Sequence, residues 1–187
     1  GTLLWGTLGN GILRSTDSGH SWQQVHESTV LSFAVHGTTL YAGLSDGLSV
    51  SVDDGITWIT LPHPPIHDLR QILIVDKQPL LVGAHAGLQR YNAQKQAWVP
   101  LPVPETPLSA IEHVTEDILI ASGLEGLVHS ADGGQTWQIV VEGARGHLAH
   151  LTFLADGTGW AGGGNTGYLL STHDGGMHWQ ARGTPPG

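Results

Sequence analysis

The sequence predicts an all-β fold, a β-propeller whose five blades are sheets of four antiparallel strands, with the first blade lacking one strand. Three observations support this prediction. The 187 residues include 27 glycines and 10 prolines while only 12% are charged, a turn-rich composition without long runs of strong helix formers. A unit that ends in tryptophan recurs five times at intervals close to the length of one propeller blade. Between these units, pairs of apolar residues indicate one further strand.

The five units end at Trp22, Trp58, Trp98, Trp137 and Trp179, which lie 36, 40, 39 and 42 residues apart. Each unit begins with a strand of the form L-x-x-G, continues through a turn ending in glycine into a second strand, and closes with a third strand begun by the tryptophan. The segments expected as innermost strands carry apolar residues three apart: Val30 and Phe33, Leu69 and Ile72, Leu108 and Ile111, Leu148 and Leu151. We therefore expect a single domain with blades at about 1–27, 28–63, 64–103, 104–142 and 143–187, either a whole propeller or a fragment of a larger one.

An octet precedes the third strand in three units: STDSGHSW at 15–22, SVDDGITW at 51–58 and SADGGQTW at 130–137. Asp17, Asp53 and Asp132 suit a tight turn, because their carboxylates can accept hydrogen bonds from the backbone N–H groups that follow. The next glycine allows a positive φ, and the tryptophan offers a large apolar surface to the neighbouring blade. A turn of this kind is needed once per blade and an active site only once, so we interpret the octet as structural.

The octet resembles the Asp-box, or bacterial neuraminidase repeat, S-x-D-x-G-x-[ST]-W, a motif of β-propellers. In the last unit, STHDGGMHW, we read one inserted residue, so that Asp174 takes the aspartate position. The third unit, YNAQKQAW, has Ala93 at that position, and we expect a looser hairpin that retains only Trp98. The resemblance implies that the boxes lie at the blade periphery, away from the usual catalytic face.

The resemblance leaves the function open, because Asp-boxes occur in sialidases, xyloglucan-type glycosidases, sorting receptors of the sortilin type and photosystem II assembly factors. The last unit, GWAGGGNTGYLLSTHDGGMHW, is most similar to the repeats of the assembly factors. Those repeats run roughly G-W-A-x-G-x-x-G-x-[IL]-x-x-T-x-D-G-G-x-x-W.

Charge and composition exclude several classes of function. A formal net charge of −9 has the wrong sign for binding a run of phosphates, so we expect no nucleic acid partner. No run of about 18 apolar residues is present, so we expect no membrane insertion. The absence of cysteine fits an exported protein and a cytosolic one equally well.

The residues of a glycosidase are not evident in the sequence. A sialidase needs clustered arginines, but Arg14 and Arg90 fall in outer strands and Arg182 follows the last tryptophan. A more general glycosidase needs two carboxylates on one face. The candidate pairs are Asp46 with Asp68 and Glu125 with Glu142. We favour a non-catalytic binding or scaffold module without catalytic residues, metal or cofactor, and keep a carbohydrate-active enzyme, or a fragment of one, as the alternative.

Function in a propeller is expected in the loops, because the strands are committed to packing. The loops opposite the octets contain the candidate binding residues His67, Asp68, His147, His63, Asp46, His85, Glu125 and Arg145, together with His26, Glu27 and Glu105. This acidic face would attract a cationic or hydrogen-bonding partner, a protein or a carbohydrate, more strongly above the histidine pKa near 6.5. We expect a monomer, or a dimer through the open edge of the incomplete first blade.

Overall fold

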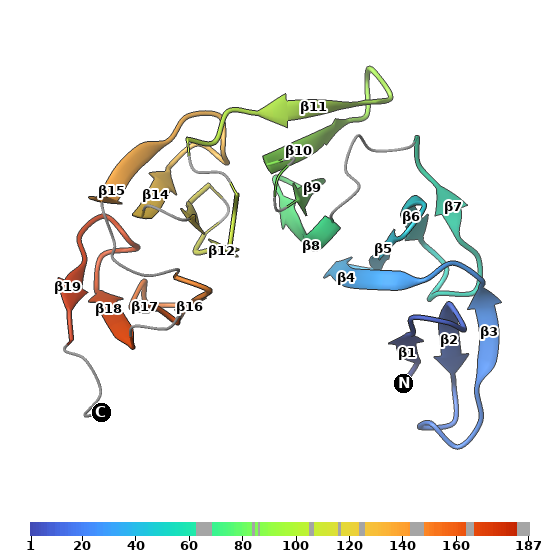
Figure 1. Cartoon of the computed structure of the whole chain (residues 1–187). Helices are drawn as coiled ribbons and strands as arrows, with labels where there is room; N and C mark the ends of the chain where they lie inside the picture. The colour runs from blue at the N-terminus through green and yellow to red at the C-terminus, as the bar shows by residue number, and fades with distance from the viewer. Residues whose placement is uncertain are drawn as a thin grey trace. The chain divides into compact units, whose positions relative to one another are not determined.

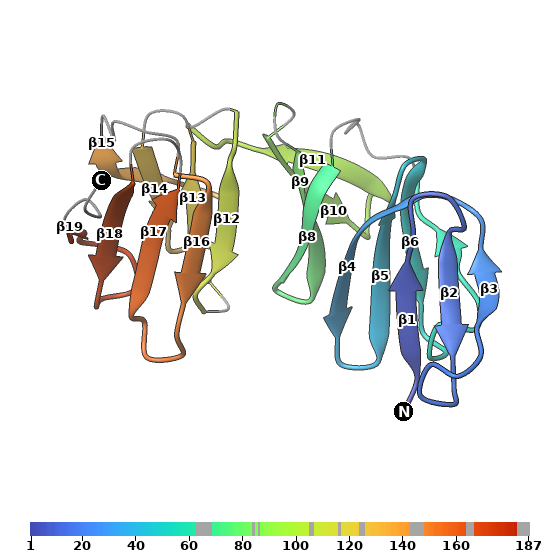
Figure 2. The same cartoon turned by 60° about the horizontal axis from the view of Figure 1, so that its bottom comes forward.

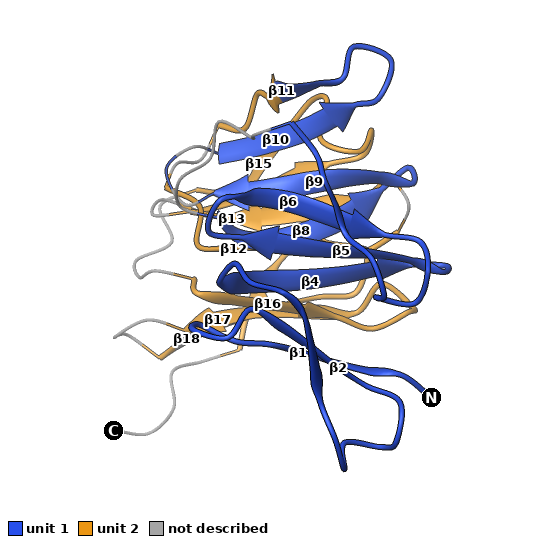
Figure 3. Ribbon diagram, turned by 90° about the vertical axis from the view of Figure 1, so that its right-hand side faces the viewer, with its two compact units in different colours: residues 1–99 blue, residues 100–187 orange. Residues whose placement is uncertain are grey.

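The computed structural model describes residues 1–62, 69–83, 85, 87–104, 107–115, 117–123, 126–142, 148–163 and 167–182. In these residues all regular secondary structure is β-strand, and the strands form five antiparallel sheets (Figure 1). The chain divides into two compact units, Gly1–Val99 and Pro100–Gly187, which are coloured separately in Figure 3.

Unit 1 contains the first three sheets. The first sheet consists of β1 (Leu3–Gly6), β2 (Ile12–Ser15) and β3 (Gln23–His26). The second consists of β4 (Val30–His36), β5 (Thr39–Leu44), β6 (Gly47–Ser51) and β7 (Ile59–Thr60). The third consists of β8 (Leu69–Val75), β9 (Gln78–Gly83), β10 (Gly87–Asn92) and β11 (Ala97–Leu101), and the end of β11 enters unit 2.

Unit 2 contains the fourth and fifth sheets. The fourth consists of β12 (Ala110–His113), β13 (Leu119–Ser122), β14 (Gly126–Ser130) and β15 (Gln138–Glu142). The fifth consists of β16 (His150–Phe153), β17 (Gly159–Gly163), β18 (Tyr168–Thr172) and β19 (Gln180–Ala181). Within each sheet the strands follow one another in chain order, as Figure 2 shows for β16, β17 and β18.

These sheets confirm the predicted fold class, a β-propeller with five blades of which the first has three strands. The segments with apolar residues three apart supply the first strand of each four-stranded sheet. Val30 and Phe33 lie in β4, Leu69 and Ile72 in β8. In unit 2, Ile111 and Leu151 lie in β12 and β16, and Leu108 and Leu148 lie just before these strands. The assignment of all residues to a single domain stays a prediction.

Glycine at the end of the L-x-x-G strand lets the next sheet approach closely. A Cβ atom on Gly6 would lie 2.6 Å from Val30 Cγ1 and 2.7 Å from a ring carbon of Phe33, both on β4. A Cβ on Gly43 of β5 would meet Leu69 and Ile72 of β8 in the same way. The glycine and the apolar pair are therefore the two halves of one contact between consecutive sheets.

Unit 2 makes the equivalent contact with a polar residue. Ser122, at the end of β13, stands where the glycine would be and is completely buried. Its hydroxyl donates to the carbonyl oxygen of Leu148 at 2.7 Å, just before β16. The buried hydroxyl is thus satisfied by the backbone that follows the fourth sheet, and the close approach is preserved.

Within each unit, apolar clusters lie between consecutive sheets, and tryptophan side chains pack against these clusters. Trp58 packs against a cluster shared by the first and second sheets, and Trp98 against a cluster shared by the second and third. Trp179 packs against the cluster of the fourth and fifth sheets. Trp22 belongs to the first sheet and is 37% exposed; its ring meets Trp5 edge to face at a centroid distance of 5.7 Å.

The substitution Gly6→Ala should destabilise unit 1 by about 1 to 3 kcal/mol, because the new methyl group overpacks Val30 and Phe33. Urea denaturation followed by tryptophan fluorescence measures this change. Gly9→Ala is the matched control, since a Cβ there would have no atom within 4 Å. Val30→Ala should cost less in the Gly6→Ala background than alone, and strict additivity would contradict the proposed contact.

Candidate functional site

The octet at 51–58 forms a closed set of hydrogen bonds around one carboxylate. The Ser51 hydroxyl donates to Asp53 Oδ1 at 2.8 Å and accepts from the N–H of Gly55 at 2.9 Å. The N–H of Thr57 donates to Asp53 Oδ1 at 2.9 Å, and its hydroxyl donates to Oδ2 at 2.6 Å. Both carboxylate oxygens are therefore used by the turn itself.

The octets at 15–22 and 130–137 repeat this arrangement around Asp17 and Asp132. The indole N–H of Trp22 donates to the carbonyl of Gly19 at 3.0 Å, and that of Trp137 to the carbonyl of Gly134 at 3.1 Å. The buried indole nitrogen of Trp58 has no hydrogen-bond partner among the described residues, and its ring packs against the apolar cluster of the first and second sheets.

The last octet corrects one prediction from the sequence. Thr172 takes the serine position: its hydroxyl donates to Asp174 Oδ1 at 2.8 Å and accepts from the N–H of Gly176 at 3.1 Å. The octet therefore runs from 172 to 179 without the inserted residue that we read. His178 replaces the hydroxyl residue before Trp179, and its Nδ1 donates to Asp174 Oδ2 at 2.6 Å. Asp174 has the predicted role.

These hydrogen bonds hold the octet carboxyls in their charged form. Hydrogen bonds from the Ser21 hydroxyl, and then from the Ser21 N–H and the Ser15 hydroxyl, lower the pKa of Asp17 to about 2. The corresponding bonds from Thr57 and Ser51 lower the pKa of Asp53 to about 2. At Asp132 burial acts in the opposite direction, yet the hydrogen bonds from Thr136 and Ser130 still lower the pKa to about 2. Groups of this kind are acceptors for their own hairpins and are unsuited to donating a proton near neutral pH.

The octet glycine also brings the hairpin against the preceding sheet. Gly55 has a φ of +79°, and a Cβ there would lie 2.9 Å from Leu4 of β1. Gly176 has a φ of +91° and faces Ile120 of β13 at similarly close range. Only glycine combines this backbone conformation with so little space. The hairpin thereby fills the gap between its own sheet and the one before it.

The hairpin of the third sheet lacks the three residues that define the octet turn. Where the other octets have a hydroxyl residue, an aspartate and a glycine, this hairpin has Tyr91, Ala93 and Lys95. The hairpin is not simply looser, because β10 runs on to Asn92 and β11 begins at Ala97, and the N–H of Lys95 donates to Asn92 Oδ1 at 2.9 Å. Trp98 keeps the tryptophan position, and the centroid of its ring lies 5.1 Å from that of Tyr91.

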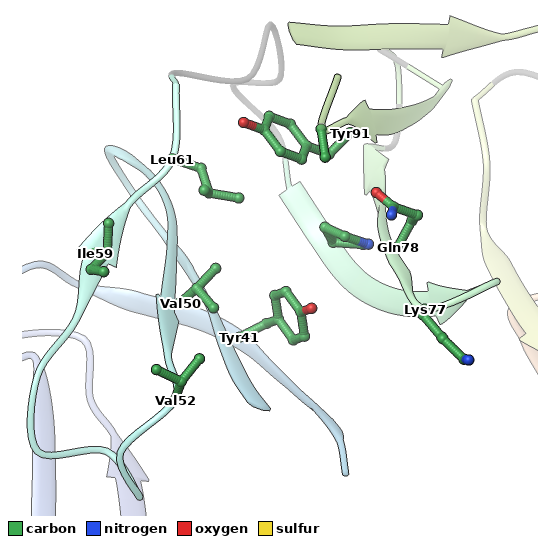
Figure 4. Close-up of a pocket in the computed structure, with 10 residues that line it drawn as sticks. Tyr41, Val50, Val52, Ile59, Leu61, Lys77, Gln78 and Tyr91 are labelled. Atoms are coloured by element: carbon green, nitrogen blue, oxygen red, sulfur yellow. The ribbon is translucent and has the colours of Figure 1, made fainter. Parts of the chain in front are cut away.

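A hollow of about 330 Å³ lies where the missing octet would have packed against the second sheet (Figure 4). The residues that line it come from both sheets: Tyr41, Val50, Val52, Ile59 and Leu61 from the second, Lys77, Gln78, Pro79, Tyr91 and Ala93 from the third. Sequence analysis did not identify this hollow, although the loss of the octet glycine at Lys95 marks its place.

Six of the eight predicted binding residues lie outside the described residues: His67, Asp68, His147, His63, Glu125 and Arg145. Glu105 also lies outside them. The other two are exposed. His85 lies between β9 and β10, and Asp46 lies between β5 and β6, where its Oδ2 accepts from the Ser28 hydroxyl at 2.7 Å. The proposed carboxylate pairs each contain one undescribed residue, so the binding face stays a prediction.

Charged groups elsewhere serve the contacts between sheets. Arg14 of β2 pairs with Asp54 of the second octet at 3.0 Å and also donates to the Asp54 carbonyl at 2.8 Å.

In unit 2, burial lowers the pKa of His129 and raises the pKa of Glu112, two groups that the sequence did not single out. No group of three or more histidine, aspartate or glutamate residues in the described ranges is placed to hold a metal ion. Nor do those ranges contain a helix that could span a membrane.

No protein-family model and no curated protein sequence matches the chain. The fold is similar to that of several solved structures. YCF48 bound to a D1 peptide is 18% identical with a TM-score of 0.64, over 86% of this chain and 57% of that one. A GH74 xyloglucanase from Xanthomonas campestris is 17% identical with a TM-score of 0.70, over 98% of this chain and 37% of that one.

The extracellular domain of the one-component system BT4673 from B. thetaiotaomicron is 14% identical with a TM-score of 0.73, over 99% of this chain and 26% of that one. The chain thus spans between about a quarter and somewhat more than half of these three proteins. At such identities the similarity establishes the propeller fold and leaves activity and partners to be argued from the residues.

Acid should destabilise the fold through the octets. The folded pKa of Asp53 is about 2, below the ordinary value of 3.8, so its stabilising contribution is present above 3.8 and is lost as pH falls through 2. Asp53→Asn should therefore lower the melting temperature near neutral pH and match the unsubstituted chain near pH 2. Melting curves recorded across this range test the prediction, and a difference that does not change with pH would contradict it.

Proposed function

We propose that the chain is a non-catalytic β-propeller module of the Asp-box class that binds or scaffolds a protein partner. The observation that carries the proposal is the complete use of the octet carboxylates by their own hairpins. The most repeated polar motif of the chain is thereby assigned to architecture. Recognition is left to the loops and to the places where the repeat is broken.

A protein partner is favoured by two further observations. One of the similar structures, YCF48, is bound to a D1 peptide. The last unit of this chain also resembles the repeats of photosystem II assembly factors. The chain covers 57% of that YCF48 chain, so we transfer only the class of ligand, a protein segment, and not the identity of the peptide.

The surface proposed for this partner is the set of loops opposite the octets, around His67, Asp68 and His147. Asp46 and His85, the two described residues among the eight candidate binding residues, are exposed and therefore accessible to a partner. With a formal net charge of −9 and only seven lysines and arginines, the chain should favour a basic segment.

The alternative is a carbohydrate-active enzyme or a fragment of one. The similarity to a GH74 xyloglucanase, over 98% of this chain, favours it. Such an enzyme would require a pair of carboxylates about 5 to 9.5 Å apart. Asp46 with Asp68 and Glu125 with Glu142 are the pairs to test.

The site prediction can be tested with an array of basic and acidic peptides. We expect basic peptides to bind, and the substitutions His67→Ala, Asp68→Ala and His147→Ala each to weaken binding by about fivefold or more, as for an interface residue whose truncation costs over 1 kcal/mol. His20→Ala and Gln135→Ala, on exposed octet residues, are the matched controls. Loss of binding from the control set alone would overturn the assignment.

A screen on fluorogenic glycosides and xyloglucan oligosaccharides tests the alternative. We expect no turnover. Turnover that disappears in Asp46→Asn or Glu142→Gln, while the melting temperature is unchanged, would replace the binding module by an enzyme.

A further inference from the structure

We propose that the hollow between the second and third sheets binds a small apolar carboxylate, a compound with one aromatic ring or branched aliphatic group and a single negative charge. This proposal goes beyond the protein-binding function. It concerns the octet end of the sheets and not the loops at the opposite end. Its failure would therefore leave the protein-binding proposal untouched.

The hollow exists because two positions of the repeat change together. In the first and fourth sheets the aliphatic residues Leu4 and Ile120 pack against the octet glycine of the following sheet, Gly55 and Gly176. The second sheet has Tyr41 at that position, and the third has Lys95 in place of the glycine. The hairpin of the third sheet consequently does not close onto the second, and the intervening space is open.

The size and lining of this space match a small apolar group. A volume of about 330 Å³ is at the lower end of the range for ligand pockets, which are mostly apolar with a few polar groups. Val50, Ile59 and Leu61 form one wall in Figure 4, and Tyr41 and Tyr91 present their rings to the same space. Two aromatic rings favour a flat ring as the occupant, since stacked or edge-to-face pairs add to the gain from burial.

The polar groups around the hollow favour a negative charge on that occupant. Lys77, on the turn between β8 and β9, is exposed and is the only charged residue among the described residues that line the hollow. No carboxylate in the described part of the chain forms an ion pair with it. The flexible stem of a lysine lets its ammonium reach a carboxylate at the opening, and Gln78 offers an amide donor beside it. One of the two lysines of this acidic chain thus lines its apolar hollow.

The test uses two probes of nearly equal shape, 3-phenylpropionate and its neutral amide, with binding followed by NMR chemical shifts. We expect the acid to shift resonances of Tyr41, Val50 and Tyr91, and to bind about fivefold more tightly than the amide at low ionic strength, as for one exposed ion pair. Lys77→Gln should remove this preference and leave the affinity for the amide unchanged.

Lys95→Gln is the matched control, because it removes the same charge from an exposed position on the neighbouring hairpin that does not line the hollow. It should preserve the preference for the acid. Ala93→Trp, at an exposed position, should fill the hollow and abolish binding of both probes. The proposal is overturned if neither probe shifts the lining residues, if acid and amide bind equally, or if the two lysine substitutions have the same effect.

Discussion

The close approach of consecutive sheets is the constraint on which the structure depends. A sheet of three or four strands cannot bury both of its faces alone, so each sheet is stable only when it packs against a neighbouring sheet. The repeat meets this requirement at two places: the glycine that ends the L-x-x-G strand admits the next sheet, and the octet glycine closes onto the previous one. A Cβ would clash with the neighbouring sheet at Gly6 and Gly43, and at the octet glycines Gly55 and Gly176. In unit 2, Ser122 replaces the first of these glycines and bonds to the backbone of the next sheet instead.

The octet solves a separate, local problem. Its aspartate gathers hydrogen bonds from a hydroxyl, a backbone N–H and a second hydroxyl within eight residues, so the turn does not need the rest of the protein to define it. A turn that is satisfied internally can be copied into each blade and can tolerate exchange of serine for threonine or of threonine for histidine, as in the last octet. This independence also keeps the repeated acids out of any shared site. The recurrence of an aspartate at the same position of three octets therefore does not imply catalysis.

Sequence reasoning succeeded where the signal was periodic. The tryptophan spacing gave the number of sheets, and the apolar pairs gave the first strands of four of them. It failed where the outcome depended on hydrogen-bond register or on space. Ser171 and Thr172 are equally good candidates for the hydroxyl position, and only the bond from Thr172 to Asp174 decides between them. The hollow beside Tyr41 could not be predicted either, because it results from two changes on different sheets that only the packing brings together. The loops of the expected binding face carry no periodicity, so the sequence predicts which residues lie there but not how their side chains are arranged.

A repeat protein acquires a specific site by breaking its own symmetry, and the third unit is where this chain departs most from its repeat. One lost aspartate would leave a weaker turn, but here the hydroxyl residue, the aspartate and the glycine are all replaced in the same hairpin. The replacement by Tyr91 is not neutral, since its ring packs on Trp98 and forms part of the hollow. Random decay of a turn would be expected to leave a hairpin without defined contacts. This hairpin instead has a continued strand pair, an asparagine that caps its turn and an indole N–H that donates to the Pro62 carbonyl at 2.7 Å. The hairpin of the third sheet thus has defined contacts of its own. The residues that it contributes to the walls of the hollow support a role for the space that they enclose.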